Sequence, residues 1–261
     1  MKKRVIKILI VVFALCFCIS AFFLVRYYVN SNTQSQVYDD LSQMMENGET
    51  ETGKEESQYT LVTDPQGNQM QILRQFADLY AENPDVIGWM RIEGTALDYP
   101  VMYKPEKKDY YLRKNFYGEK ATHGCLYIQE NCSVLPQSDN LTIYGHNMRD
   151  GSMFACLKNY NKKSFWQEHP VIIFNTLTEE AQYEIFAVFT TTSTVGEGFK
   201  YHNFIDAGNE KEFNEFVNIC KALSFYDTGV EPVMGDKFIT LSTCEKSFEN
   251  GRLVVVARKI V

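Results

Sequence analysis

Three residues of this chain supply the groups that thiol acyl transfer requires. Cys244 ends a strand pattern over residues 238–244 and is followed by polar residues, so we expect its thiol at the exposed mouth of a strand. His146 ends a second strand pattern, over residues 141–146. A cysteine and a histidine from distant parts of a chain form the minimal pair for this chemistry.

Arg252 could complete the group. It begins the last strand pattern, directly after Asn250 and Gly251. If the strands on either side of residues 245–251 form a hairpin, Arg252 lies beside Cys244, where a guanidinium could hydrogen-bond a developing oxyanion. Taken singly, the cysteine would more often be a core residue and the arginine a surface ion-pair partner. The hypothesis therefore depends on the three residues together.

The elements that must position these residues are mostly strands. Eight apolar, β-branched and aromatic segments predict one closed or nearly closed β-barrel, and the absence of βαβ alternation argues against a Rossmann-like sheet. Helices are predicted from Ile72 to Tyr80 and over 210–223, with shorter ones at 152–160 and near 107–114. Residues 193–204, which include Gly196 and Gly198, are expected to form a mobile loop that covers a substrate. The predicted strands are 88–92, 96–103, 124–129, 141–146, 171–175, 183–192, 238–244 and 253–260.

The N-terminal segment predicts a single transmembrane helix. Residues 8–25 carry no charge, Arg26 closes the run, and four basic residues precede it. This length approaches the hydrocarbon thickness of a bilayer, and the positive-inside rule then places the N-terminus in the cytoplasm. We therefore expect a cytoplasmic tail at 1–7, an anchor at 8–26 and an extracellular remainder in the cell membrane. A cleaved signal peptide is the alternative, and it also places the body outside.

The rest of the chain divides by composition. Residues 27–58 are polar and acidic and predict an extracellular stalk, helical in part at 37–45, and residues 59–261 predict the catalytic domain. The net charge of −7 argues against a nucleic-acid partner. Five cysteines lie in the body, an odd number, and none has metal-binding spacing. Cys125 and Cys132 could form a disulfide, although buried reduced thiols are the simpler interpretation.

Several motifs resemble those of the sortase family, and class B sortases most closely. The resemblance covers about residues 72–261 and includes the helix at 210–223. The stretches that carry it are Ile-Tyr-Gly-His-Asn at 143–147, Asp-Gly-Ser-Met-Phe at 150–154, Thr-Leu-Ser-Thr-Cys at 240–244, Arg-Leu-Val-Val-Val-Ala at 252–257 and Tyr-Tyr-Leu at 110–112.

The resemblance implies a closed eight-stranded sortase-type β-barrel with N-terminal and peripheral helices. It implies a membrane-anchored cysteine transpeptidase in which Cys244 attacks a Thr–Gly bond of a C-terminal sorting signal of the NPxT or LPxT type. His146 would protonate the leaving amine, and Arg252 with the backbone N–H of Glu245 would hold the oxyanion.

The same resemblance implies the partners. They are secreted proteins that carry the signal and an amine acceptor, either a peptidoglycan precursor or a pilin lysine, and no metal or cofactor is implied. The candidate peptide-binding residues are Tyr144, Leu112, Ser193 and Ser242.

Three alternatives remain open at the level of sequence. The same residues would serve an exported cysteine peptidase that transfers to water. Thr122-His123-Gly124-Cys125 is similar to the His-Gly-Cys core of L,D-transpeptidases, although that motif continues with an apolar residue and Arg, whereas Leu126 and Tyr127 follow here. A membrane-tethered binding barrel with a structural thiol is the third.

Overall fold

The centre of the structure is a closed barrel of eight strands. The computed structural model describes residues 2–51 and 58–260. The strand order around the barrel is β10-β8-β7-β3-β4-β5-β6-β9, and it closes on itself. The prediction of an eight-stranded barrel is thus confirmed. The strands are β3 (Val86–Arg91), β4 (Asp98–Met102), β5 (Leu126–Ile128), β6 (Asn140–Tyr144), β7 (Val171–Thr176), β8 (Gln182–Thr192), β9 (Phe238–Glu245) and β10 (Gly251–Lys259).

Two of the strand pairs are parallel, and one of them decides where the chemistry can occur. β6 runs parallel to β9 with Tyr144 opposite Ser242, while β9 and β10 form an antiparallel hairpin. A buried hydrogen bond from Thr240 Oγ1 to Asn140 Oδ1 (2.7 Å) ties β6 and β9 together near their start. Because parallel strands end at the same edge of a sheet, the residues that follow β6 and β9 emerge side by side.

Strands β9 and β10 are buried along most of both faces, and successive residues join different cores. In β10, Leu253, Val255 and Ala257 belong to the core inside the barrel, whereas Val254 and Val256 pack outward under α4 (Glu210–Leu223). This alternation follows from the two-residue period of a strand. The helical spacing predicted for α4 is confirmed, since its buried face consists of Phe213, Phe216, Val217 and Cys220.

Short strands and helices lie between the barrel strands and before them. One of these, β2 (Gln69–Leu73), shows that the helix predicted from Ile72 was placed too early. β1 (Tyr59–Thr63) and β2 form a separate hairpin that was not predicted from the sequence, so the helix predicted from Ile72 begins later. Ile72 is apolar at both helical and strand spacing, and pairing with β1 decides in favour of the strand. The remaining helices are η1 (Arg74–Phe76), α2 (Ala77–Glu82), η2 (Tyr110–Arg113), η3 (Phe154–Asn161), α3 (Lys163–Glu168) and η4 (Tyr201–Asn203).

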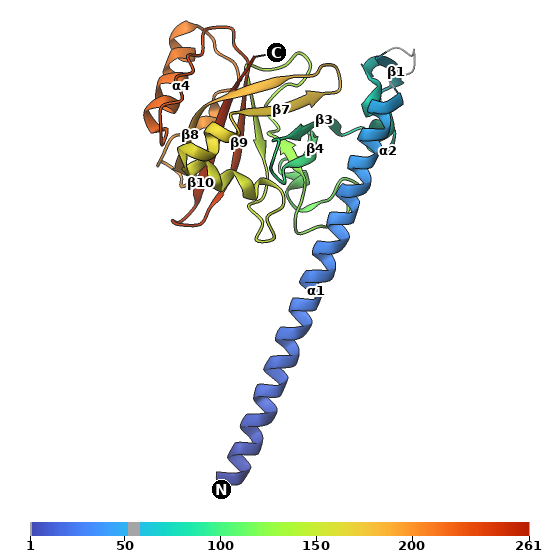
Figure 1. The fold of residues 1–261 in the computed structure, drawn as a ribbon, viewed down its shortest axis with the longest axis vertical. Coiled ribbons are helices and arrows are strands. Elements are labelled where there is room, and N and C mark those ends of the chain that lie inside the picture. Colours follow the sequence, from blue (N-terminus) through green and yellow to red (C-terminus); the bar gives the residue numbers. More distant parts are fainter. Residues whose placement is uncertain (1, 52–57, 261) are drawn as a thin grey trace.

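One long helix, α1 (Lys2–Glu51), projects from the barrel (Figure 1). Its residues Arg4–Arg26 are long and apolar enough to cross a membrane, with a mean hydropathy of 3.1. The part that we expected to be a polar stalk continues the helix to Glu51, and residues 52–57 lie outside the described residues. Tyr38, Leu41 and Met45 are buried against the domain because they recur on one helical face. This part of α1 therefore packs as an element of the domain.

We predict that Leu41→Ala lowers the free energy of unfolding by about 2–5 kcal/mol, the usual cost of truncating a fully buried leucine. Chemical denaturation of the full chain in detergent micelles, followed by tryptophan fluorescence, would measure it. The matched control is Gln43→Ala, which changes an exposed residue of the same turn. Equal stability of the two variants would contradict docking of α1.

Candidate active site

A groove of about 660 Å³ lies at the edge of the barrel where β6 and β9 end. Its walls come from η2, β5 and the residues that follow it, β6, β9, the start of β10 and η4. All of the sequence-predicted site residues line it except Glu245. Those that line it are Leu112, Tyr144, His146, Ser193, Ser242, Cys244 and Arg252.

Cys244 and His146 lie at corresponding positions beyond the paired residues of β9 and β6. Each is two residues past the pair Tyr144–Ser242. Thr243 Oγ1 donates to Gly145 O (2.7 Å), and Asn147 Nδ2 donates to Cys244 O (3.0 Å), so the two strand ends are tied directly to each other. The Cys244 side chain is exposed at this edge. The thiol is therefore accessible in the groove that His146 also lines.

Arg252 lies directly opposite Cys244 in the β9–β10 hairpin, as the sequence predicted. Directly paired residues of antiparallel strands share a face of the sheet. The half-buried guanidinium donates to Gly251 O (2.9 Å), which holds it at the start of β10. Arg252, a permanent cation with several N–H donors, is thus the cross-strand neighbour of Cys244.

The other cysteines of the body are poor nucleophiles. Cys125, Cys132, Cys156 and Cys220 are buried and free, so Cys125 and Cys132 form no disulfide. Burial raises the pKa of Cys125 to about 12 and that of Cys132 and Cys156 to about 11, and it raises the pKa of Cys220 as well. Since the thiolate is the reactive form, the structure argues against Cys125 as a nucleophile.

His146 is held as a neutral, oriented ring. Its Nε2 donates to the carbonyl oxygen of Leu112 (2.7 Å), which leaves Nδ1 as the basic nitrogen. Burial lowers the pKa of His146 below its ordinary value of 6.5, and the Leu112 bond partly opposes this shift. Gly145, directly before the histidine, has no open space at its Cβ position. A Cβ there would lie 2.5 Å from Leu126 Cδ2 and 2.6 Å from Phe154 Cδ2, so glycine permits close packing behind the histidine.

The predicted peptide-binding residues differ in their exposure. Ser242 is buried and shares a hydrogen bond with Tyr201 Oη (2.6 Å), so it is a framework residue of the groove floor. Tyr144 donates to Gln129 Oε1 (3.2 Å), and Ser193 Oγ donates to Asn250 O (3.1 Å). The side chain of Glu245 accepts from Ser247 N (2.8 Å) in the hairpin turn.

Several groove residues were not predicted from the sequence, among them Arg113, Tyr201 and His202. The segment 193–204 was expected to be a mobile loop, but it contains η4, in which Tyr201 is buried under the groove. Thr191 Oγ1 accepts from Phe199 N (2.9 Å) and anchors the preceding turn. The aromatic residues of this segment could have indicated that it is packed against the domain, since a solvated loop seldom carries several of them.

Comparisons with known proteins agree with this geometry. The sortase domain matches residues 90–260. The chain belongs to the sortase family. Sortase B of Listeria monocytogenes is 35% identical over 185 residues, covering 70% of this chain and 73% of the relative. This relative places the chain among the class B sortases, which belong to a family of cysteine transpeptidases.

Solved sortase structures have the same fold. The structure of a Staphylococcus aureus sortase B–substrate complex has a TM-score of 0.75 and 26% identity, and the similarity covers 89% of this chain and 98% of that one. A structure of sortase B complexed with triglycine has a TM-score of 0.73 and 25% identity, and the similarity covers 88% of this chain and 98% of that one. Sortases are associated with membranes, and the N-terminal helix of this sortase is consistent with such a location.

We predict that the His146 imidazole titrates below pH 6.5 in the folded sortase, because burial disfavours its charged form. NMR of histidine-labelled full-length protein would measure the midpoint, with His146→Gln to assign the resonance. Because the pKa of His146 is lower in the folded chain than in the unfolded chain, the unfolded chain binds more protons than the folded chain just below pH 6.5. The contribution of His146 therefore lowers the free energy of unfolding as the pH falls through that value. A midpoint above 6.5 would instead indicate a stable ion pair with a thiolate.

Proposed function

We propose that this sortase transfers secreted proteins through a thioacyl intermediate on Cys244, with His146 and Arg252 as the other catalytic residues. The observation that carries the proposal is their meeting in one groove. Cys244 is the one exposed thiol among residues 58–260, and His146 and Arg252 reach it from the two strands that flank β9.

The chemistry follows from these positions. The Cys244 sulfur attacks the carbonyl carbon of a Thr–Gly bond, and a carbon–sulfur bond replaces the carbon–nitrogen bond. His146 in its protonated form gives its proton to the departing glycine amine. In the second step the incoming amine loses a proton to the neutral ring and forms a new carbon–nitrogen bond, while the carbon–sulfur bond breaks and releases the Cys244 thiolate. Arg252 donates to the oxyanion of both tetrahedral states. The intermediate divides one difficult exchange into two easier steps.

We infer that the substrate is a C-terminal sorting signal of the NPxT or LPxT type and that the acceptor is an amine of a wall precursor or a pilin lysine. Two observations on relatives support this inference. One sortase B structure holds a substrate, and another holds triglycine, a peptide with a free terminal amine. The groove along β6 and η2, with Tyr144, Leu112 and Ser193 on its wall, is where the signal would lie.

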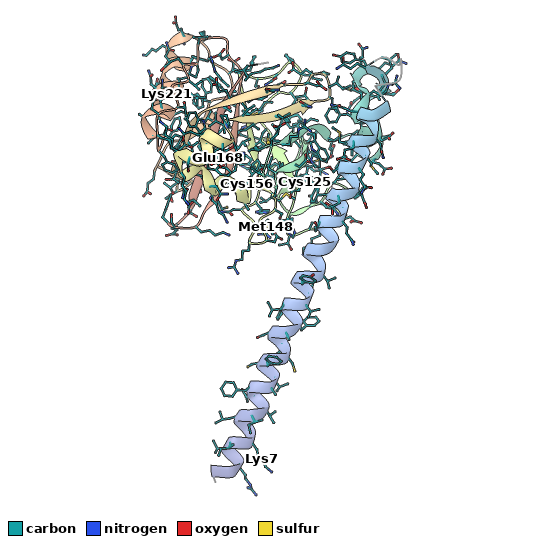
Figure 2. All side chains as sticks on the ribbon, viewed as in Figure 1. Lys7, Cys125, Met148, Cys156, Glu168 and Lys221 are labelled. Carbon is teal, nitrogen blue, oxygen red and sulfur yellow. The ribbon has the colours of Figure 1, made fainter. Side chains whose placement is uncertain are left out.

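We further infer that residues 8–26 anchor the enzyme, with residues 1–7 in the cytoplasm and the barrel outside. Met148, two residues after His146, lies at the end of the domain toward the projecting half of α1 (Figure 2). The active-site edge would then face the membrane, where exported substrates and lipid-linked acceptors are found. The proposed catalytic domain is 59–261, and the docked part of α1 would be a structural support outside these bounds.

A decisive test uses the full chain in detergent micelles. We expect peptides with an Asn-Pro-x-Thr or Leu-Pro-x-Thr signal to form an acyl adduct on Cys244 by mass spectrometry. The adduct should transfer to triglycine. Cys244→Ala should abolish it, whereas Cys125→Ala should leave it in place.

The outcomes separate the alternative functions. Release of the acyl group only to water would make the protein a hydrolase with the same nucleophile. Absence of any adduct, together with a Cys244 that alkylates no faster than buried Cys220, would favour the binding barrel.

We predict that Arg252→Ala reduces kcat/KM by about 10²–10³-fold, the usual cost of losing one oxyanion donor. Arg252→Lys should recover only part of the activity, because an ammonium lacks the planar fork of donors. Arg149→Ala is the matched control, since Arg149 is exposed and does not line the groove. Similar activities of Arg252→Ala and Arg149→Ala would exclude a role in oxyanion binding.

A further inference from the structure

Gly124 lies unusually close to the backbone that holds His146. It has a positive φ of 59°, and a Cβ at this position would lie 2.4 Å from Leu112 O and 2.7 Å from Tyr111 O. Leu112 O is the atom that accepts the hydrogen bond from His146 Nε2. Cys125 N also donates to Tyr111 O (3.1 Å). The segment 124–125, directly before β5, is therefore packed against the carbonyl that orients His146.

The helix α1 supports the same segment from the other side. Tyr38 donates its hydroxyl hydrogen to Gly124 O, and the hydroxyl also contacts Cys125 Sγ at 3.4 Å. Both Tyr38 and Cys125 are almost fully buried, and Cys125 lies on the side of the barrel that faces α1 (Figure 2). Burial raises the pKa of Tyr38, so the hydroxyl stays protonated and remains a donor. A continuous series of contacts thus runs from Tyr38 through Gly124 and Leu112 to His146.

His123 ties the segment to the loop on the far side of His146. Its ring is 3% exposed, and Nε2 donates to Asp150 Oδ2 (2.7 Å). The other oxygen of Asp150 accepts from the backbone N–H (3.1 Å) and hydroxyl (2.6 Å) of Ser152. Phe154 N donates to His146 O (3.0 Å) just beyond. The residues before and after this loop are therefore held relative to the same segment, 123–125, that precedes β5.

We propose that Tyr38, His123 and Gly124 form a brace that positions His146 through the Leu112 carbonyl and the 147–153 loop. The inference rests on the proposed catalytic role of His146, and it makes the docked part of α1 a component of the catalytic unit. The motif His123-Gly124-Cys125, which is similar to a catalytic sequence in another family, has a structural use here. Its glycine allows close approach, its histidine binds the loop, and its cysteine is packed under Tyr38.

The first test replaces Gly124 by Ala. The methyl group must displace Leu112 O, which weakens the hydrogen bond that raises the pKa of His146. We expect the His146 midpoint measured by NMR to fall further, and kcat to drop roughly 10–100-fold with KM within about twofold, because misplacement by about 1 Å has such an effect. Gly118→Ala is the matched control. Gly118 also has a positive φ, 76°, but a Cβ there meets only Tyr110 Oη at 3.5 Å.

The second test serves if Gly124→Ala does not fold. Tyr38→Phe removes only the hydroxyl that reaches Gly124, and we expect a smaller fall in the His146 midpoint and a kcat reduced roughly 3–10-fold, about what one lost hydrogen bond allows. Tyr160→Phe is the control, since that buried hydroxyl donates to His169 O (2.8 Å) instead. Both variants are made in the full chain in micelles.

The two measurements separate the brace from the proposed function. An unchanged His146 midpoint in Tyr38→Phe and in folded Gly124→Ala would overturn the brace. A midpoint that falls while transpeptidation is unaltered would support the brace and overturn the catalytic role of His146. Equal changes in the Gly118→Ala and Tyr160→Phe controls would also overturn the brace, since general destabilisation would then explain the effect.

Discussion

The active site depends on the parallel pairing of β6 with β9. His146 and Cys244 are nearly one hundred residues apart, and the hydrogen bond between Thr243 and Gly145 spans 98 positions of the chain. Only closure of the barrel places the two strand ends side by side with a matched register. A shift of one residue would turn Cys244 to the opposite face, so the buried bond between Thr240 and Asn140 near the other end of the pair also protects the chemistry.

Differences in burial make Cys244 more accessible than the other cysteines of the body. The four remaining body cysteines lie in cores where the charged form is disfavoured, whereas Cys244 follows the last buried residues of β9 and reaches solvent. The same effect keeps His146 mostly neutral. In the proposed mechanism, the protonated His146 that gives its proton to the leaving amine is then the minor form of the ring at neutral pH. The positive charge of Arg252 is permanent and does not depend on that equilibrium.

The long helix connects this site to its surroundings. Residues 34–45 of α1 pack on the domain, and the apolar part begins only a few turns away, so the barrel and the proposed anchor share one continuous element. A truncated chain that starts at Gln58 would remove Tyr38, Leu41 and Met45 together. The contacts of the proposed brace that come from Tyr38 and the packing of the domain on α1 would then both be lost.

Local patterns in the sequence were enough to predict many features of the fold and the candidate site. Each barrel strand was predictable because its apolar residues are contiguous or alternate within a few positions. The placement of Arg252 followed from a short hairpin, and the apolar run before Arg26 from its length. The motifs around His146 and Cys244 indicated the family before any geometry was known. By contrast, the β1–β2 hairpin and the docking of α1 were not predictable, since isolated polar helices and hairpins are stable only against a partner surface.

The use of individual side chains, in contrast, follows only from the folded arrangement. Ser242 became a framework residue because Tyr201, some forty positions away, covers it. Gly145 and Gly124 are required by the close approach of Leu126, Phe154 and Leu112, which no local pattern records. Burial in the core raises the pKa of Cys125 and disfavours its thiolate, although its sequence context is similar to a catalytic one. Burial and the pKa shifts that it causes are sums over contacts distant in the chain, and they exist only once the chain has folded.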